Sequence, residues 1–139
     1  MTSPNDLDPE VMQKLIEAAR KAREFAYSPY SNILVGAALL TSDGKIFTGC
    51  NVENSNYSAT ICAERTAVVK AVSEGYRDFQ AIAIIADRPV PTSPCGVCRQ
   101  VLSQFNREMP VIMATVRNDL VDIMTVSELL PKVFISGSS

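Results

Sequence analysis

Residues 81–86 have the sequence AIAIIA, and this short apolar run constrains the fold more than any other segment. A strand with one face in water alternates apolar and polar side chains, whereas a strand covered on both faces is apolar throughout. The run therefore predicts a central strand of a sheet that is covered on both sides.

Helical patterns precede and follow this strand. Asp8 is a good N-cap with a proline at the next position, and apolar side chains at helical spacing predict a helix over residues 9–26. Thr60 is expected to cap a second helix that Gly75 ends. Two more helices are expected, one beginning near Cys98 and a short one at residues 127–130.

The remaining apolar runs predict strands. An Asp-Gly pair at residues 43–44 is typical of a hairpin turn. The strands expected beside the central one cover residues 33–41, 46–51, 111–116 and 120–124. This order predicts an α/β fold with one mixed sheet and helices on both faces. We expect a single domain over residues 1–139, with flexible ends at about 1–7 and 135–139.

The chain of 139 residues contains four cysteines and no histidine. The missing histidine excludes a Ser-His-Asp triad, a Cys-His dyad and any histidine metal ligand. Chemistry here must therefore use carboxylates, thiolates, hydroxyls, Lys or Arg, or a metal ion.

Charge and hydropathy exclude further classes of protein. The net charge of −2 argues against binding to nucleic acid, which usually requires a basic surface. No apolar run is long enough to cross a membrane, and the N-terminal residues are acidic rather than signal-like. We expect a cytoplasmic protein with reduced thiols, so cysteine spacing first suggests a metal site or catalysis.

Three cysteines stand where helices are expected to begin. Cys95 and Cys98 form a C-x-x-C pair, which alone does not distinguish a metal site from a redox pair or two buried thiols. Cys62 adds a third thiol, and three thiolates can hold Zn²⁺ with one position left for water. Glu64 is the candidate proton carrier, provided that the metal lies beyond the helix end, because residues i and i+2 do not share a helix face.

Other polar residues flank these segments. Asn51 and Glu53 stand at i and i+2 at the end of a predicted strand, so an amide and a carboxylate can converge on one diol. Three thiolates on Zn²⁺ carry a net charge of −1. Arg65 and Arg99 directly follow the segments that contain the cysteines, so their positive charges can offset it. We predict that Arg65 donates hydrogen bonds to ligand sulfurs, and that Cys50 is a buried structural thiol.

Seven short segments, taken in order, resemble the small homotetrameric cytidine deaminases, and the resemblance covers nearly the whole chain. The segments are YSPYS (27–31), VGAALL (35–40), GCNVEN (49–54), ICAERTA (61–67), AVSEGY (71–76), SPCGVCRQ (93–100) and ELLP (128–131). His or Cys followed by x-Glu, and later by Pro-Cys-x-x-Cys, is the pattern of zinc deaminases, here in its three-cysteine form with Cys62 first.

The resemblance implies a three-layer α/β/α sandwich around a five-stranded mixed sheet, one zinc ion per chain and a homotetramer with active sites at subunit interfaces. It implies hydrolytic deamination of cytidine and deoxycytidine in pyrimidine salvage, with a nucleoside as the substrate. The implied zinc ligands are Cys62, Cys95 and Cys98, with Glu64 as the proton carrier. The implied substrate contacts are Asn51 and Glu53 to the ribose, the Ala63 N–H to the base carbonyl, and Tyr57, Tyr30 and Phe134 around the pocket, the last two from neighbouring subunits.

The sequence departs from the family pattern at one position, and it leaves several alternative functions open. Ile33 stands where many members of the family carry Phe, which changes one wall of the expected base pocket. A structural zinc module, a redox role for Cys95 and Cys98, and a deaminase similar to blasticidin S deaminase are the alternatives. A nucleotide deaminase is disfavoured, because Glu53 and the acidic composition offer no cationic site for a phosphate.

Overall fold

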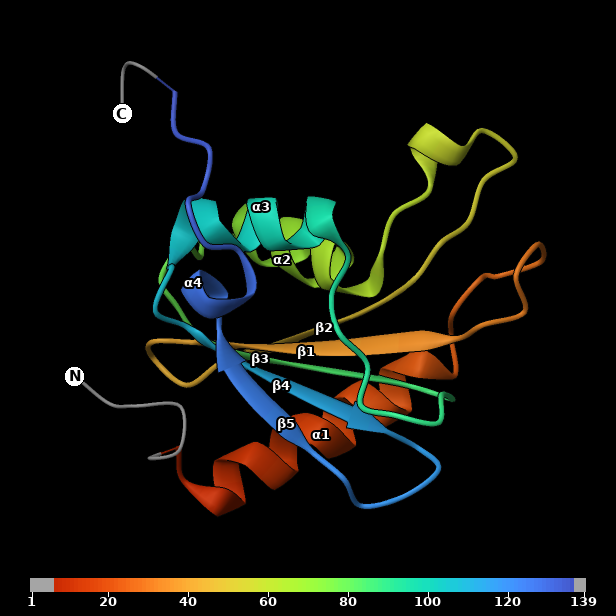
Figure 1. Ribbon diagram of the computed structural model, residues 1–139, viewed down its shortest axis with the longest axis horizontal. Coiled ribbons are helices and arrows are strands. Elements are labelled where there is room, and N and C mark those ends of the chain that lie inside the picture. Colours follow the sequence, from red (N-terminus) through yellow and green to blue (C-terminus); the bar gives the residue numbers. More distant parts are fainter. Residues whose placement is uncertain (1–6, 137–139) are drawn as a thin grey trace.

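The computed structural model describes residues 7–136, in which a five-stranded sheet has helices on both faces (Figure 1). The sheet order is β2-β1-β3-β4-β5, with β3 and β4 parallel and the other neighbouring pairs antiparallel. The strands are β1 (Val35–Thr41), β2 (Ile46–Cys50), β3 (Phe79–Ala86), β4 (Pro110–Thr115) and β5 (Asp122–Thr125). The predicted mixed sheet with helices on both faces is confirmed.

The helices divide between the two faces of the sheet. One face carries α1 (Pro9–Arg23), and the other carries α2 (Ala63–Ser73), α3 (Gly96–Phe105) and α4 (Val126–Leu129) (Figure 1). A 3-10 helix, η2 (Tyr57–Ala59), lies in the loop that projects between β2 and α2. Within residues 7–136, no helix has the length and apolar character needed to cross a membrane.

The central strand β3 is buried on both faces, as its apolar run predicts. Ile82 and Ile84 belong to the core on the side of α2 and α3, whereas Ala83 and Ile85 belong to the core on the side of α1. Small residues allow α1 to approach closely, since a Cβ added at Gly36 would lie 1.9 Å from the carbonyl oxygen of Ala19.

The predicted end of α1 is wrong by three residues. The helix ends at Arg23, and the next three N–H groups bond to carbonyls three residues back, so the final turn tightens. Tyr27 then pairs with Val52 as an isolated β-bridge.

The predicted start of α2 is also wrong. Cys62, not Thr60, is its N-cap residue, and the Thr60 hydroxyl instead accepts a hydrogen bond from the Asn54 N–H at 3.1 Å. Ile61 pairs with Val52 in extended conformation, so α2 begins only at Ala63. Strand boundaries differ from the predicted ones by a few residues. Residues 1–6 and 137–139, where flexible ends were expected, lie outside the described residues.

Candidate active site

Three thiols from two separate segments meet above the face of the sheet that carries α2 and α3. The sulfurs of Cys62, Cys95 and Cys98 lie within 4.8 Å of one another, and Cys95 is 3.6 Å from Cys62 and 3.4 Å from Cys98. In the described part of the chain, this is the only group of three side chains that could ligate a metal ion. Three thiolates at these separations fit the ligand chemistry of Zn²⁺, which prefers sulfur and nitrogen donors.

Two of the three thiols are N-cap residues. Cys62 caps α2 and Cys95 caps α3, and neither side chain accepts a hydrogen bond from its own helix. Their sulfurs therefore remain free to face each other at the positive ends of two helix dipoles, which favour thiolates.

The thiols of Cys62 and Cys98 shift each other's pKa in opposite directions. The pKa of Cys62 is lowered to about 5, mainly by its hydrogen bond with Cys98 and further by Arg65. The pKa of Cys98 is raised, because its thiol is hydrogen bonded to Cys62 and because the side chain is buried. A bound Zn²⁺ would allow all three sulfurs to ionise together.

Arg65 donates a hydrogen bond to the sulfur of Cys62, as predicted. Its Nη2 lies 3.4 Å from that sulfur and 3.2 Å from the carbonyl oxygen of Thr60. Arg99 behaves differently, because Nε donates to the Pro94 carbonyl at 2.9 Å and Nη1 to the Leu129 carbonyl at 2.7 Å. Arg99 thus fastens the segment before Cys95 to α4, and its hydrogen bonds go to backbone oxygens.

Glu64 is a buried carboxyl group beside the thiols, with only 4% of its surface exposed. Burial and, to a smaller extent, the negative charge of Cys62 raise its pKa to about 7. A carboxyl group with such a pKa can both accept and donate a proton near neutral pH. Cys62 precedes the first turn of α2 while Glu64 lies within it, and both line one cavity, so a metal beyond the helix end is compatible with this spacing.

A cavity of about 500 Å³ opens next to this cluster. It is lined by Cys62, Cys95 and Glu64 and by residues of the β1 and β2 ends. Of the other predicted site residues, Ile33, Asn51, Glu53 and Ala63 also line it. Cys98 lies behind this wall and is fully buried.

Two polar residues on the cavity wall are already hydrogen bonded. Asn51 accepts from the Val35 N–H at 2.9 Å and donates to the Ile33 carbonyl at 2.8 Å, so it fixes the start of β1. Glu53 accepts bonds from the loop before β1, from the N–H groups of Tyr30 and Ser31 and from the Ser31 hydroxyl.

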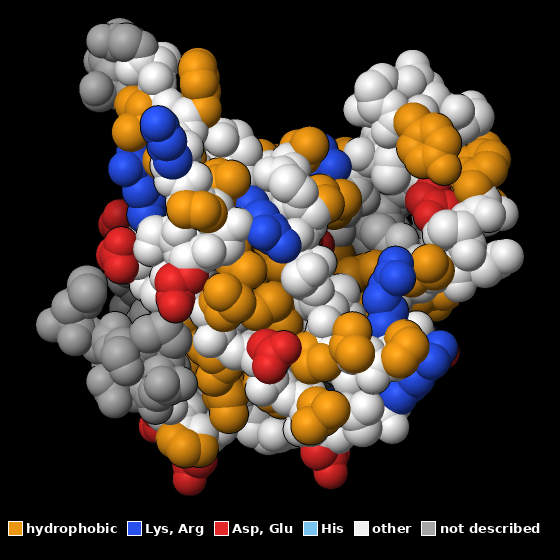
Figure 2. Space-filling model, viewed as in Figure 1, with side chains coloured by type: hydrophobic (Ala, Val, Ile, Leu, Met, Phe, Trp, Pro, Cys, Tyr) orange, Lys and Arg blue, Asp and Glu red, His pale blue; other side chains and the backbone are white. Residues whose placement is uncertain are grey.

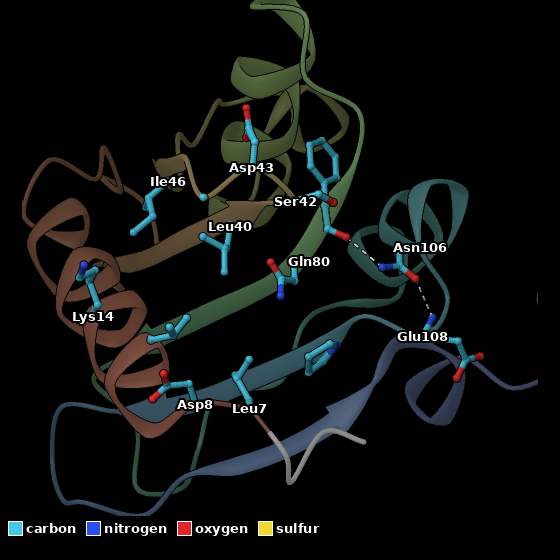
Figure 3. Close-up of a pocket in the computed structure, with 14 residues that line it drawn as sticks. Leu7, Asp8, Lys14, Leu40, Ser42, Asp43, Ile46, Gln80, Asn106 and Glu108 are labelled. Atoms are coloured by element: carbon cyan, nitrogen blue, oxygen red, sulfur yellow. Dashed lines mark hydrogen bonds between the residues drawn. The ribbon is translucent and has the colours of Figure 1, made fainter. Parts of the chain in front are cut away.

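A larger cavity, about 800 Å³, lies at the opposite ends of the strands, between the start of α1 and the β1–β2 hairpin (Figure 3). Some of its polar lining residues hydrogen bond to one another: the Asn106 amide donates to the Phe79 carbonyl and accepts from the Glu108 N–H. None of its lining residues is a cysteine. The smaller cavity beside the thiols is therefore the candidate active site.

Residues 9–115 match the family model described as the cytidine and deoxycytidylate deaminase zinc-binding region. The chain belongs to this deaminase family. A cytidine deaminase of Sporosarcina psychrophila is 55% identical over 124 residues, which cover 88% of this chain and 90% of that protein.

Solved structures agree with this assignment. The crystal structure of cytidine deaminase from Burkholderia pseudomallei has a TM-score of 0.85 and 48% identity, and it covers 88% of this chain and 98% of that one. Cytidine deaminase from Mycobacterium tuberculosis has a TM-score of 0.78 and 37% identity, covering 89% and 97% of the two chains. The predicted deaminase fold is confirmed, and zinc is the metal of this deaminase family.

Some predicted site residues of this deaminase lie outside the main cavity. Tyr30 and Tyr57 line a neighbouring cavity of about 220 Å³, which also touches Ser31 and Glu53. Phe134 lines neither of these two cavities. Cys50 is half-buried rather than buried, and it lies beside Phe25 in a separate depression away from the thiol group.

Sequence reasoning missed several lining residues of the deaminase pocket. Ser31 lies in the YSPYS segment (27–31), but only the structure shows that its hydroxyl donates to Glu53. Residues 90–93 and Arg88 also line the cavity, and the Thr92 hydroxyl there is buried without a hydrogen-bond partner among the described residues. Their position directly before Pro94 and Cys95 is the signal that could have found them.

Proposed function

We propose that this chain is a cytidine deaminase that hydrolyses cytidine and deoxycytidine to uridine and deoxyuridine with release of ammonia. The observation that carries the proposal is the buried carboxyl group of Glu64, which lines one cavity with two of the three clustered thiols. Three protein ligands leave a fourth zinc position open, and an open position distinguishes a catalytic zinc site from a structural one.

Different residues carry out metal binding and proton transfer in the proposed reaction. Cys62, Cys95 and Cys98 would hold the zinc ion, which would lower the pKa of a bound water molecule. Glu64 accepts a proton from the attacking water and gives it to N3 of cytosine. Glu64 then takes the proton of the new hydroxyl at C4 and delivers it to the amino group, so that the C4–N bond breaks, the C4 carbonyl forms and ammonia leaves. The raised pKa of Glu64 suits both transfers, because the carboxyl group must alternate between its two protonation states.

Other residues hold the nucleoside in place. The Ala63 N–H at the start of α2 donates to the base carbonyl, and Asn51 and Glu53 bind the ribose hydroxyls. Ile33 provides an aliphatic wall of the base pocket, and Arg65 offsets the charge of the thiolates. Arg99 supports the ligand segment through the backbone contacts described above.

We further propose a cytoplasmic homotetramer with active sites at subunit interfaces, in which each chain is one domain. Tyr57 completes the pocket of its own chain, and neighbouring subunits contribute Tyr30 and Phe134. The high exposure of these rings supports the proposal: 92% for Tyr57, 61% for Tyr30 and 77% for Phe134. Rings this exposed in an isolated chain are suited to burial against another copy.

One experiment tests the function and separates the alternatives. The purified protein is analysed for zinc per chain, and its turnover of cytidine, deoxycytidine and blasticidin S is followed by ultraviolet absorbance. We expect one zinc per chain and loss of the amino group from both nucleosides. Zinc without turnover would indicate a structural zinc module, turnover of blasticidin S alone would indicate the antibiotic deaminase, and a zinc-free protein with a Cys95–Cys98 disulfide would indicate the redox role.

A further inference from the structure

The Glu53 carboxylate is held by the loop that precedes β1. Its Oε1 accepts from the Tyr30 N–H at 3.0 Å and from the Ser31 N–H at 3.1 Å. Its Oε2 accepts from the Ser31 hydroxyl, which makes a close contact. Both partners line the main cavity and the neighbouring one, so this contact forms part of the wall between them.

The hydroxyl of Ser31 has a fixed direction. It accepts a hydrogen bond from the Ile33 N–H at 3.1 Å, so its own proton is free to be donated to Glu53. The loop is closed by the bond from the Asn32 N–H to the Ser28 carbonyl at 3.0 Å, and the Glu53 N–H is tied to the Tyr27 carbonyl at 2.8 Å. Backbone hydrogen bonds therefore hold both ends of the contact.

The hydrogen bonds already made by Glu53 limit how many of its acceptor positions are available to a substrate. A carboxylate offers about four lone-pair positions, two on each oxygen. Both positions on Oε1 are filled by N–H groups, and one position on Oε2 is filled by Ser31. One position on Oε2 is left, enough for a single hydroxyl donor.

We propose that Ser31 is a positioning residue that holds Oε2 of Glu53 toward the pocket, so that the carboxylate accepts a hydrogen bond from one sugar hydroxyl only. The inference rests on the proposed function, because it concerns how the nucleoside is bound. It assigns to Ser31 an effect on the binding of hydroxylated sugars and none on the deamination step.

The test compares sugars with and without hydroxyls. Ser31→Ala removes the donor, Ser31→Thr keeps it on an exposed side chain with room for a methyl group, and Ser28→Ala makes the same chemical change in the same loop at a residue that does not donate to Glu53. KM and kcat are measured for each variant with cytidine and with 2′,3′-dideoxycytidine.

We expect Ser31→Ala to raise KM for cytidine about tenfold with kcat changed less than about twofold, because a hydrogen bond to an ionised acceptor is lost. Ser31→Thr and Ser28→Ala should resemble the parent protein. With 2′,3′-dideoxycytidine, Ser31→Ala should have no effect, since Glu53 has no hydroxyl to bind. An equal loss with both substrates, or a loss in kcat alone, would overturn the inference.

Two monodeoxy substrates test the single acceptor position. The effect of Ser31→Ala should persist with one of 2′-deoxycytidine and 3′-deoxycytidine and vanish with the other. Persistence with both, or loss with both, would contradict the count of one hydroxyl. A parent protein that binds zinc but deaminates none of these nucleosides would refute the proposed function instead, so the two failures are distinguishable.

Discussion

Glu64 is a single carboxyl group that must both take and give a proton, and Glu64→Gln tests this role. The amide nearly matches the carboxyl group in shape, so the fold and the zinc content should not change. Turnover of cytidine should fall by about a hundredfold to ten-thousandfold, the usual contribution of a general acid–base group. Zinc analysis and the ultraviolet assay measure the two quantities, and a zinc-loaded variant that retains the parent rate would contradict the role.

Arg65 acts on the thiolates through one hydrogen bond and its charge. Without that positive charge, the sulfurs donate more electron density to zinc, and its water becomes less acidic. We therefore predict that Arg65→Gln moves the acidic limb of the pH–rate profile to higher pH. Arg20→Gln is the matched control, because Arg20 forms only an exposed ion pair with Glu17 on α1. An acidic limb at the same pH in Arg65→Gln and the parent would argue against the prediction.

At the level of elements, the sequence predicted the layers and the thiol group, but not where α2 begins. Apolar patterns report burial and period, which is why the central strand and both helical layers were predictable. The usual capping preference selects a hydroxyl such as Thr60, whereas the actual N-cap is Cys62, whose sulfur faces other sulfurs instead of its helix. The contact between Ser31 and Glu53 joins loops 22 residues apart, and no local pattern reports it.

The close packing of α2 on β2 at Gly49 gives a testable prediction. A Cβ at Gly49 would lie 2.4 Å from the Ala63 carbonyl oxygen and 2.5 Å from the Ala67 nitrogen, both backbone atoms that cannot rotate away. Gly49→Ala must therefore push α2 from the sheet, and Cys62 with it. We expect unfolding free energy to fall by about 1–3 kcal/mol or more and zinc content to drop.

Gly44→Ala provides the control for that experiment. Gly44 has φ +94° in the β1–β2 hairpin and open space around its Cα. The substitution should reduce stability through backbone strain alone, by about 1–2 kcal/mol, and leave zinc content unchanged. Equal zinc loss in the two variants would show that general destabilisation, and not the position of α2, controls the metal site. Denaturant unfolding and metal analysis of the same samples decide between these outcomes.

The whole molecule has two segments that extend beyond its body. The loop with η2 rises on one side of α2 and α3, and the C-terminal segment rises on the other, leaving a hollow between them (Figures 1 and 2). Tyr57 lies on the first segment and Phe134 on the second, and both rings are largely exposed. Projecting segments that carry exposed aromatic rings are well placed to contact other copies, which links the proposed tetramer to the pocket.

Subunit mixing tests whether the sites are shared. If Tyr30 serves a neighbour's pocket while Glu64 serves its own, a Tyr30→Ala chain lacks a ring that its neighbour needs, and a Glu64→Gln chain lacks its own proton carrier. Unfolding and refolding the two variants together should then produce some sites that have both residues intact. We expect the mixture to exceed the summed activities of the separately refolded variants, with a mass near four chains by light scattering. If each site uses only its own chain, the mixture will equal that sum, because no intact site can form.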